Sequence, residues 1–301
     1  MEITSCDLCG SDDSRLFLNR LDRFSDQEFK LVTCTQCGLI YLNPRPTQSE
    51  IIEFYPDYYE SYQTLDDDNT SLQNWHIQRM LHMQLDFVEK YATQRGHLLD
   101  IGCSTGRFLI IARDRGWDIK GVEFVEKAAQ IARQEYFLDV SIGSLLSTPL
   151  KENYYDVVTL WDVLEHLPNP KSALEKIHHL LRDDGILIFS IPNLKSFDRY
   201  LFGKAWIGWD APRHFTLYSA ENLIQLFNET GYQILTKRCI TGGKGTFFLS
   251  MDLLSNQCKA FSFIRIFDPI ISLLLWPYRQ ISYKLKRGPI ITYVINKDNT
   301  Q

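Results

Sequence analysis

The stretch His97-Leu-Leu-Asp-Ile-Gly-Cys-Ser-Thr-Gly-Arg107 decides the fold class of this chain. A short apolar run ends in Asp100, a loop with Gly102 and Gly106 follows, and the apolar segment 108–112 comes next. This order predicts a strand, a tight turn and a helix. Such corners bind nucleotides in α/β folds, because small residues let a ligand approach the backbone closely.

The acid inside the corner limits which ligand can bind there. The pyrophosphate of a dinucleotide sits on a helix N-terminus, and the carboxylate of Asp100 would repel it. S-adenosylmethionine instead carries an ammonium and a sulfonium group, which a carboxylate attracts. The corner therefore favours a methyl-donor site over an NAD site.

Strands and helices alternate along the rest of the chain. Together with the first strand at the corner, this pattern predicts a doubly wound, mostly parallel, Rossmann-like sheet of seven strands, the last two of them antiparallel. The further strands are expected at 118–122, 139–142, 155–160, 186–191, 233–240 and 289–296, and helices at 70–91, 125–135, 171–181 and 219–230.

Four motifs in this order resemble the class I S-adenosylmethionine-dependent methyltransferases over residues 95–240 and the last strand. Asp100-Ile-Gly102-Cys-Ser104-Thr-Gly106 is similar to the family's Asp-x-Gly-x-Gly-x-Gly, with Ser104 in place of the middle glycine. Glu123 ends the second strand, where the family's acid takes the ribose hydroxyls. The segments 155–167 and 191–193 resemble the ends of the family's fourth and fifth strands.

The resemblance implies which residues hold the methyl donor. Ser144 stands where the family often places an acid or a small polar group near adenine. The expected donor-binding residues are Asp100, Gly102, Ser104, Gly106, Glu123, Ser144 and Asp162.

Two matched cysteine turns lie near the N-terminus, Cys6-Asp-Leu-Cys9-Gly and Cys34-Thr-Gln-Cys37-Gly. Two turns of this spacing supply the tetrahedral four-sulfur shell of structural zinc, and iron in a rubredoxin-like site is the alternative. A zinc ribbon in front of such a methyltransferase resembles a bacterial subgroup associated with cell-surface glycans, deoxysugars or lipid-linked intermediates.

Two regions offer candidates for the chemistry. His166 follows the fourth strand of the sheet at its carboxyl end, where α/β folds bind ligands, and is a candidate base or a packing residue. The segment 206–215 contains Trp209, Asp210, Arg213 and His214. We expect the first three to contact the acceptor, with His214 as the better base. The alternative is that the tryptophans cover the cofactor and that Arg213 pairs with Asp210.

Composition and charge limit the partners and the cellular location that we expect for this 301-residue chain. Its net charge of −5 argues against nucleic acid as a partner, and the N-terminus lacks the pattern of a secretion signal. A cytoplasmic protein is expected. The apolar segment 261–287, whose last part contains basic residues, is a candidate for peripheral binding at the inner face of the membrane, or for a core helix or homodimer surface.

We therefore expect a zinc ribbon over 1–45, a linker and leading helix over 46–94, and a methyltransferase domain over 95–301. Within this domain, 196–218 would form the acceptor site and 245–288 an apolar helical insertion. The expected reaction is O-methylation of a small-molecule, sugar, glycan or lipid-linked acceptor. The alternatives are a quinone-pathway O-methyltransferase, a ribosomal-RNA methyltransferase with a zinc module, and a non-catalytic binding protein.

Overall fold

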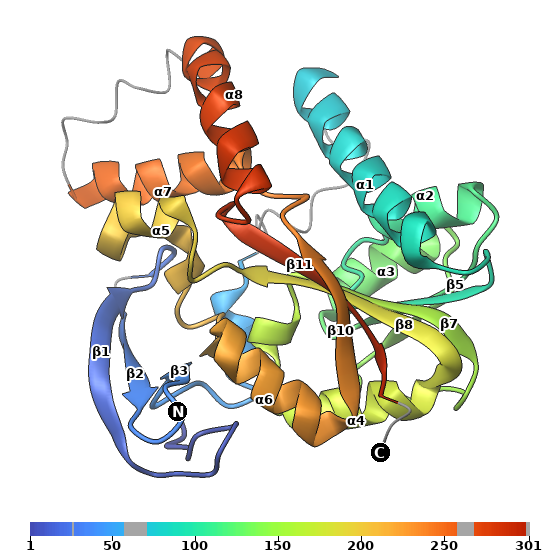
Figure 1. Ribbon diagram of the computed structural model, residues 1–301, viewed down its shortest axis with the longest axis horizontal. Coiled ribbons are helices and arrows are strands. Elements are labelled where there is room, and N and C mark those ends of the chain that lie inside the picture. The colour runs from blue at the N-terminus through green and yellow to red at the C-terminus, as the bar shows by residue number, and fades with distance from the viewer. Residues whose placement is uncertain (26, 57–70, 258–267, 299–301) are drawn as a thin grey trace. The chain divides into compact units, whose positions relative to one another are not determined.

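The computed structural model describes residues 1–25, 27–56, 71–257 and 268–298 (Figure 1). The chain forms two compact units, each assembled from segments that are distant in sequence. Unit 1 comprises residues 1–54, 191–225 and 237–292, and unit 2 comprises residues 55–190, 226–236 and 293–301.

A seven-stranded sheet, most of whose residues belong to unit 2, confirms the predicted fold class. Its strand order is β10-β11-β8-β7-β4-β5-β6, and β4 pairs in parallel with both β5 and β7. The pairs β5–β6 and β7–β8 are parallel too. The strands are β4 (His97–Ile101), β5 (Asp118–Glu123), β6 (Val140–Ile142), β7 (Tyr155–Trp161), β8 (Leu181–Pro192), β10 (Tyr232–Arg238) and β11 (Ile290–Lys297).

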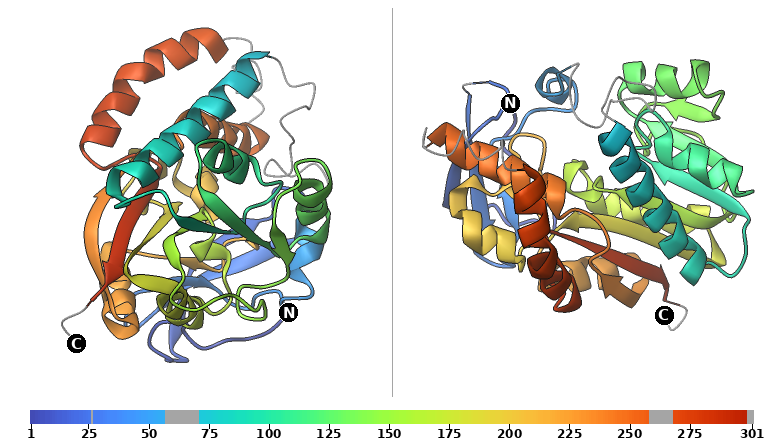
Figure 2. Two further views of the ribbon diagram at one scale, coloured as in Figure 1. Left: turned by 90° about the vertical axis from the view of Figure 1, so that its right-hand side faces the viewer. Right: turned by 90° about the horizontal axis from the view of Figure 1, so that it is seen from above.

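The helices of unit 2 pack on both faces of this sheet. Helix α1 (Ser71–Tyr91) packs along α2 (Arg107–Asp114), while α2 and α3 (Glu126–Gln134) contact β5. Helix α4 (Pro170–Leu180) lies on the opposite face, as Figures 1 and 2 show. Pro170 suits the first turn of α4, where a backbone N–H has no helical partner. The short helix η3 (Leu164–His166) follows β7.

Unit 1 contains a four-stranded sheet in the order β1-β2-β3-β9. The strands β1 (Ser14–Leu21), β2 (Glu28–Cys34) and β3 (Ile40–Leu42) come from the predicted ribbon, whereas β9 (Thr216–Leu217) comes from the segment predicted to form the acceptor site. Strand β3 pairs with β9 in antiparallel register, with Ile40 opposite Leu217. The strands of the predicted ribbon therefore form one sheet with a later segment of the chain.

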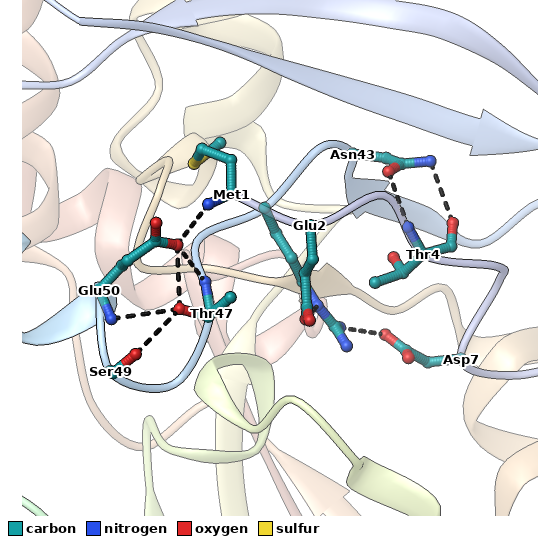
Figure 3. A network of polar contacts seen from close by, with 9 residues as sticks. Met1, Glu2, Thr4, Asp7, Asn43, Thr47, Ser49 and Glu50 are labelled. Carbon is teal, nitrogen blue, oxygen red and sulfur yellow. Dashed lines mark hydrogen bonds and ion pairs between the residues drawn. The ribbon is translucent and has the colours of Figure 1, made fainter.

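Short contacts fasten the start of the chain to the end of the ribbon (Figure 3). Thr4 and Asn43 exchange two hydrogen bonds of 3.1 Å, one in each direction. The Arg45 guanidinium donates to Glu2 and to Asp7, each over 2.9 Å. Because Asp7 follows Cys6 directly, these contacts hold the first cysteine turn against the proline-rich segment.

The remaining helices of unit 1 surround an aromatic cluster. The ring of Phe247 on α7 (Lys244–Gln257) contacts Phe202 on α5 (Phe197–Phe202) and Tyr278 on α8 (Asp268–Lys284). The short helices η1 (Ile51–Phe54), η4 (Gly203–Ala205) and η5 (Ile207–Trp209) belong to unit 1, and α6 (Ala220–Thr230) contributes to both units.

The expected apolar insertion over 245–288 thus contains two helices, with residues 258–267 outside the described part. No helix within the described ranges has the length and apolar content to span a bilayer.

Candidate functional site

The corner after β4 has the backbone that the glycine motif requires. Gly102 and Gly106 have φ angles of 71° and 81°, in the left-handed region that favours glycine. A Cβ atom on Gly102 would lie 2.6 Å from a methyl of Val163, and one on Gly106 would lie 2.2 Å from a methyl of Leu138. The two glycines therefore form a turn that is packed too closely against Val163 and Leu138 for a side chain to fit.

Ser104, which replaces the middle glycine of the motif, keeps the turn but is strained. Its φ of 51° lies in the left-handed region, which is unfavourable for a residue with a Cβ atom. Its backbone N–H donates to Glu123 Oε2 over 2.8 Å. The strained conformation aims this N–H at the acid that ends β5.

Two buried carboxylates flank the turn. Asp100 Oδ1 accepts from the Thr159 hydroxyl over 2.7 Å, and burial raises the pKa of Asp100 to about 7, aided by the charge of Glu123 and opposed by that hydrogen bond. Glu123 Oε1 accepts from Val125 N–H over 2.7 Å. Burial raises the pKa of Glu123 as well, although its backbone N–H donors oppose the rise. A cationic ligand would therefore be favoured beside these acids.

The other two expected donor-binding residues have their own local contacts. Asp162, with a φ of 56°, follows β7, and its Oδ1 accepts from the Ser190 hydroxyl over 2.8 Å. Burial raises the pKa of Asp162 to about 6. The Ser144 hydroxyl lies 2.9 Å from that of Ser147 and accepts from Ser147 N–H over 3.2 Å. Donor contact by Asp162 and Ser144 stays a prediction.

His166 lies in η3, within the same unit as the glycine corner. Its Nδ1 is 3.0 Å from the Tyr55 hydroxyl oxygen, and both side chains are half-buried. Next to it, Glu165 is 1% exposed, and neither carboxylate oxygen has a hydrogen-bond partner within the described residues. Burial raises the pKa of Glu165 well above its ordinary value.

Another buried polar atom near the end of β7 lacks a partner in the part of the chain that the structure describes. Trp161 Nε1 makes no hydrogen bond, and its ring packs edge-on against Phe108 of α2 with centroids 5.5 Å apart. The sequence analysis gave no site role to Trp161 or Glu165, although both lie in the segment 155–167 that carries part of the family resemblance. Their position at the carboxyl end of a parallel strand was the available signal.

The segment around Trp209 is packed within unit 1. Arg213, with no exposed surface, donates to Asp210 over 2.6 and 2.8 Å and to Asp22 over 2.7 Å. Trp209 is 3% exposed and donates to the Gly203 carbonyl over 2.9 Å. These contacts match the alternative in which Arg213 pairs with Asp210. Acceptor binding by Trp209, Asp210 and Arg213 stays a prediction.

The backbone defines which nitrogen of neutral His214 carries the proton. Its Nδ1 lies 2.9 Å from the Gly208 carbonyl oxygen, which can only accept, so Nδ1 is the donor and Nε2 the basic nitrogen. Burial lowers the pKa of His214, while the charge of Asp210 and the Gly208 hydrogen bond oppose the shift. The lowered pKa favours the neutral form of this side chain at pH 7.

The four N-terminal cysteines converge as their spacing predicts. One ligand atom from each lies within 4.8 Å of the others, and the Sγ–Sγ distances Cys6–Cys37 and Cys9–Cys34 are both 3.5 Å. Zn–S bonds of about 2.3 Å would place tetrahedral sulfurs about 3.8 Å apart, so the cluster fits such an ion. Burial raises the pKa of Cys34, but hydrogen bonds from the Cys37 and Gln36 backbone and from Cys9 outweigh it and lower the value to about 7.

Comparisons with known proteins agree with this geometry. Residues 70–237, more than half of the chain, match a family model described as a methyltransferase domain. Two curated relatives, from Azoarcus and Aromatoleum aromaticum, are named ubiquinone biosynthesis O-methyltransferase. They are 29% and 31% identical to this chain over 130 and 127 residues, or 40% of it. The chain spans about half the length of these relatives, since each alignment covers 54% of the relative.

Solved structures share the fold. A geranyl diphosphate C-methyltransferase from Streptomyces coelicolor, solved with S-adenosyl-L-homocysteine, has a TM-score of 0.54 at 14% identity, covering 84% of this chain and 99% of that one. Magnesium protoporphyrin IX methyltransferase from Synechocystis scores 0.53 at 14% identity, covering 83% and 100%. The glycine corner, its flanking acids and the matching family model agree with one another, and the chain belongs to the methyltransferase domain family.

Proposed function

We propose that this enzyme methylates a phenolic hydroxyl, with His166 as the general base. The observation that carries the proposal is the 3.0 Å contact between His166 Nδ1 and the Tyr55 hydroxyl, in the unit that also contains the glycine corner. In the tautomer with the proton on Nδ1, that nitrogen donates to Tyr55 and Nε2 can accept the proton of an acceptor hydroxyl.

The donor would be held by the groups around the turn after β4. S-adenosylmethionine, when bound, supplies a methyl group on a sulfonium, which is already a good leaving group. Gly102 and Gly106 allow the tight turn beside it, Glu123 would be the acid for its ribose hydroxyls, and Asp100 would favour its positive charge. The remaining work is to align the acceptor and to remove its proton.

The strength of the base favours a phenol over a sugar. A histidine titrates near 6.5 and a phenol near 10, whereas an alcohol in a sugar is a much weaker acid that imidazole deprotonates poorly. The names of the curated relatives support the quinone-pathway alternative. The sugar, glycan or lipid-linked acceptor expected from the ribbon receives no such support, and the buried Trp206 and Trp209 offer little surface for stacking on a sugar ring.

The test uses methyl-labelled S-adenosylmethionine with a catechol, a hydroxylated quinone precursor and a sugar nucleotide as acceptors. We expect label in the phenolic acceptors. His166→Ala should lower kcat by about 10²–10⁴ and remove the rise of kcat with pH through the histidine titration. Tyr55→Phe should produce a smaller loss, because the base remains but is less well oriented.

Two results would contradict this assignment. Label confined to the sugar nucleotide would restore the first expectation about the acceptor. A normal pH profile in His166→Ala, together with its loss in His214→Ala, would make His214 the base instead.

We also infer that Cys6, Cys9, Cys34 and Cys37 hold a structural zinc ion. Four thiolates close a tetrahedral shell and leave no position for water, so the ion would stabilise unit 1 without taking part in methyl transfer. Elemental analysis of purified protein should find one zinc per chain. If the site held iron instead, the purified protein would have the visible colour of a rubredoxin-like site. The inference would be refuted if Cys34→Ser kept the metal content and the stability of the wild-type protein.

A further inference from the structure

Asp100 belongs to a row of opposed residues that crosses four strands of the seven-stranded sheet. In the parallel register, Gly121 of β5 lies opposite Asp100 on one side and Thr159 of β7 lies opposite it on the other. Ile188 of β8 is the next residue in the row, opposite Thr159. Because opposed residues of parallel strands direct their side chains to the same face of a sheet, this row offers Asp100 one polar side chain, that of Thr159.

The Thr159 hydroxyl group has a single proton, and the geometry gives that proton to Asp100. Its oxygen lies 2.7 Å from Asp100 Oδ1 and 3.5 Å from the Leu99 carbonyl oxygen, so the carboxylate is the acceptor at normal hydrogen-bond distance. Thr159 has no exposed surface, and Asp100 is 3% exposed. No other group of the described residues donates to this carboxyl group, so a ligand would have Oδ2 as its acceptor.

The titratable groups beside Asp100 do not stabilise its charge. Burial raises the pKa of Asp100, and the negative charge of Glu123 at the end of β5 raises it further. The Cys103 thiol in the turn adds no positive charge, and burial and both acids raise its pKa well above the ordinary value. Glu123 itself accepts from two backbone N–H groups. Within the described residues, the ionised form of Asp100 therefore depends on one side chain, that of Thr159.

We propose that Thr159 is a positioning residue for the methyl donor. Its hydroxyl group would hold the Asp100 carboxylate in the charged form, and in the orientation, that bind the cationic part of S-adenosylmethionine. This inference rests on the donor binding proposed above. Thr159 would act through Asp100 and not on the donor itself, by offsetting part of the cost of a carboxylate that is buried in the sheet.

The experiment replaces Thr159 by valine, which has nearly the same shape but no hydroxyl group. Titration calorimetry then gives the dissociation constant of S-adenosylmethionine at about pH 6, 7 and 8. Losing a hydrogen bond to a charged group should raise the pKa of Asp100 by about one to two pH units. Since the donor favours the ionised acid, the affinity should fall about five- to fiftyfold at pH 7. At pH 8, where more of Asp100 is ionised, the loss should be about a third of that or less.

Three further variants separate this role from a purely structural one. Thr159→Ala also lacks the hydroxyl group and should show the same dependence on pH as Thr159→Val. Thr159→Ser keeps the hydroxyl group and should bind the donor as wild type does at each pH. Thr292→Val makes the matched change on β11, at a threonine that has no exposed surface and whose hydroxyl has no partner in the described part of the chain. It should leave donor affinity unchanged, and urea unfolding shows that each variant is folded.

Two results would overturn the role of Thr159 while leaving the proposed donor in place. One is an unchanged affinity in Thr159→Val. The other is a loss of affinity that is equal at every pH, because the substitution would then act on packing and not on the charge of Asp100.

A different result would contradict the donor assignment itself, namely wild-type protein that binds no S-adenosylmethionine at any pH. The contact could still be tested without a ligand. A carbon-13 NMR titration should give a pKa of about 7 for Asp100 in the wild-type protein and a higher pKa in Thr159→Val. Equal pKa values in the two proteins would refute the inference.

Discussion

Replacing Arg213 by methionine should destabilise unit 1 by about 3–5 kcal/mol, because the change removes the guanidinium that pairs with buried Asp22 and that shares buried Asp210 with Arg23. The side chains of Asp22 and Asp210 are 1% and 6% exposed, so water cannot replace the guanidinium. Arg213 also donates to the Phe54 carbonyl over 2.9 Å. The expected loss is therefore large compared with that of an exposed ion pair, which is about 0–1 kcal/mol.

Conservative variants divide this loss into parts. Arg213→Lys keeps the charge but not the planar fork that reaches both acids, and about half of the loss should remain. Asp22→Asn removes one charge while keeping a hydrogen-bonding group, and should cost about 1.5–3 kcal/mol.

The loss of stability in Arg213→Met should also depend on pH. In the wild-type protein, burial would raise the pKa of Asp210, but the hydrogen bonds and charges of Arg213 and Arg23 outweigh it and depress the pKa. A depressed pKa contributes stability that is present above the unfolded-state pKa and is lost as the pH falls through the folded-state pKa. In Arg213→Met less opposes the effect of burial on Asp210, so the pKa of Asp210 should rise and the difference in stability from wild type should shrink between pH 7 and about pH 4.

The assay is urea unfolding followed by tryptophan fluorescence, with KM for the acceptor measured on the same preparations. The structural role predicts a lower midpoint at an unchanged KM. If Arg213→Met unfolds within about 1 kcal/mol of wild type while KM rises, the arginine is a substrate contact and the reasoning from burial is refuted.

Three further predictions concern the donor corner and the cysteines. Ser104→Gly should raise the free energy of unfolding by about 0.5–1 kcal/mol, because it relieves the strain at a φ of 51°, whereas Ser104→Ala, which keeps the Cβ atom, should not; urea midpoints check both. The affinity for S-adenosylmethionine should fall about tenfold from pH 8 to pH 6, because the cationic donor favours the ionised form of Asp100, whose pKa in the free protein is about 7. Titration calorimetry measures this affinity, and in Asp100→Asn the affinity should depend less on pH. A strong chelator should lower the melting temperature of the wild-type protein and should leave that of Cys34→Ser unchanged, as calorimetric scans would show.

The local pattern of apolar and turn residues was sufficient to predict the seven-stranded sheet. Strand β5 and helices α1 and α3 begin and end within about one residue of their predicted limits, because apolar runs and glycine turns mark them directly. Strand β8 begins at Leu181, earlier than residue 186, since the polar residues Arg182–Asp184 hide its first part from a search for apolar runs.

Pairings between distant segments could not be predicted from the sequence. Nothing near Asp22 indicates Arg213 as its partner, and nothing in Thr216–Leu217 indicates a strand that pairs with β3. The same limit applies to the donor corner, where the predicted Ser104 turn proved strained only once its backbone was known. Spacing rules describe neighbours in sequence, while buried charge pairs and sheet edges depend on the complete chain.

The pairing of β3 with β9 has a consequence for biosynthesis. On a ribosome the cysteine-containing strands emerge first, yet the last strand of their sheet is made only after residues 55–190 have passed, about 10–30 s later at ordinary translation rates. During that interval β3 has an open edge on which another strand could pair, and the bound metal would be the main restraint on the nascent hairpin. A shortage of metal during synthesis should therefore reduce the yield of native enzyme more than removal of metal after folding.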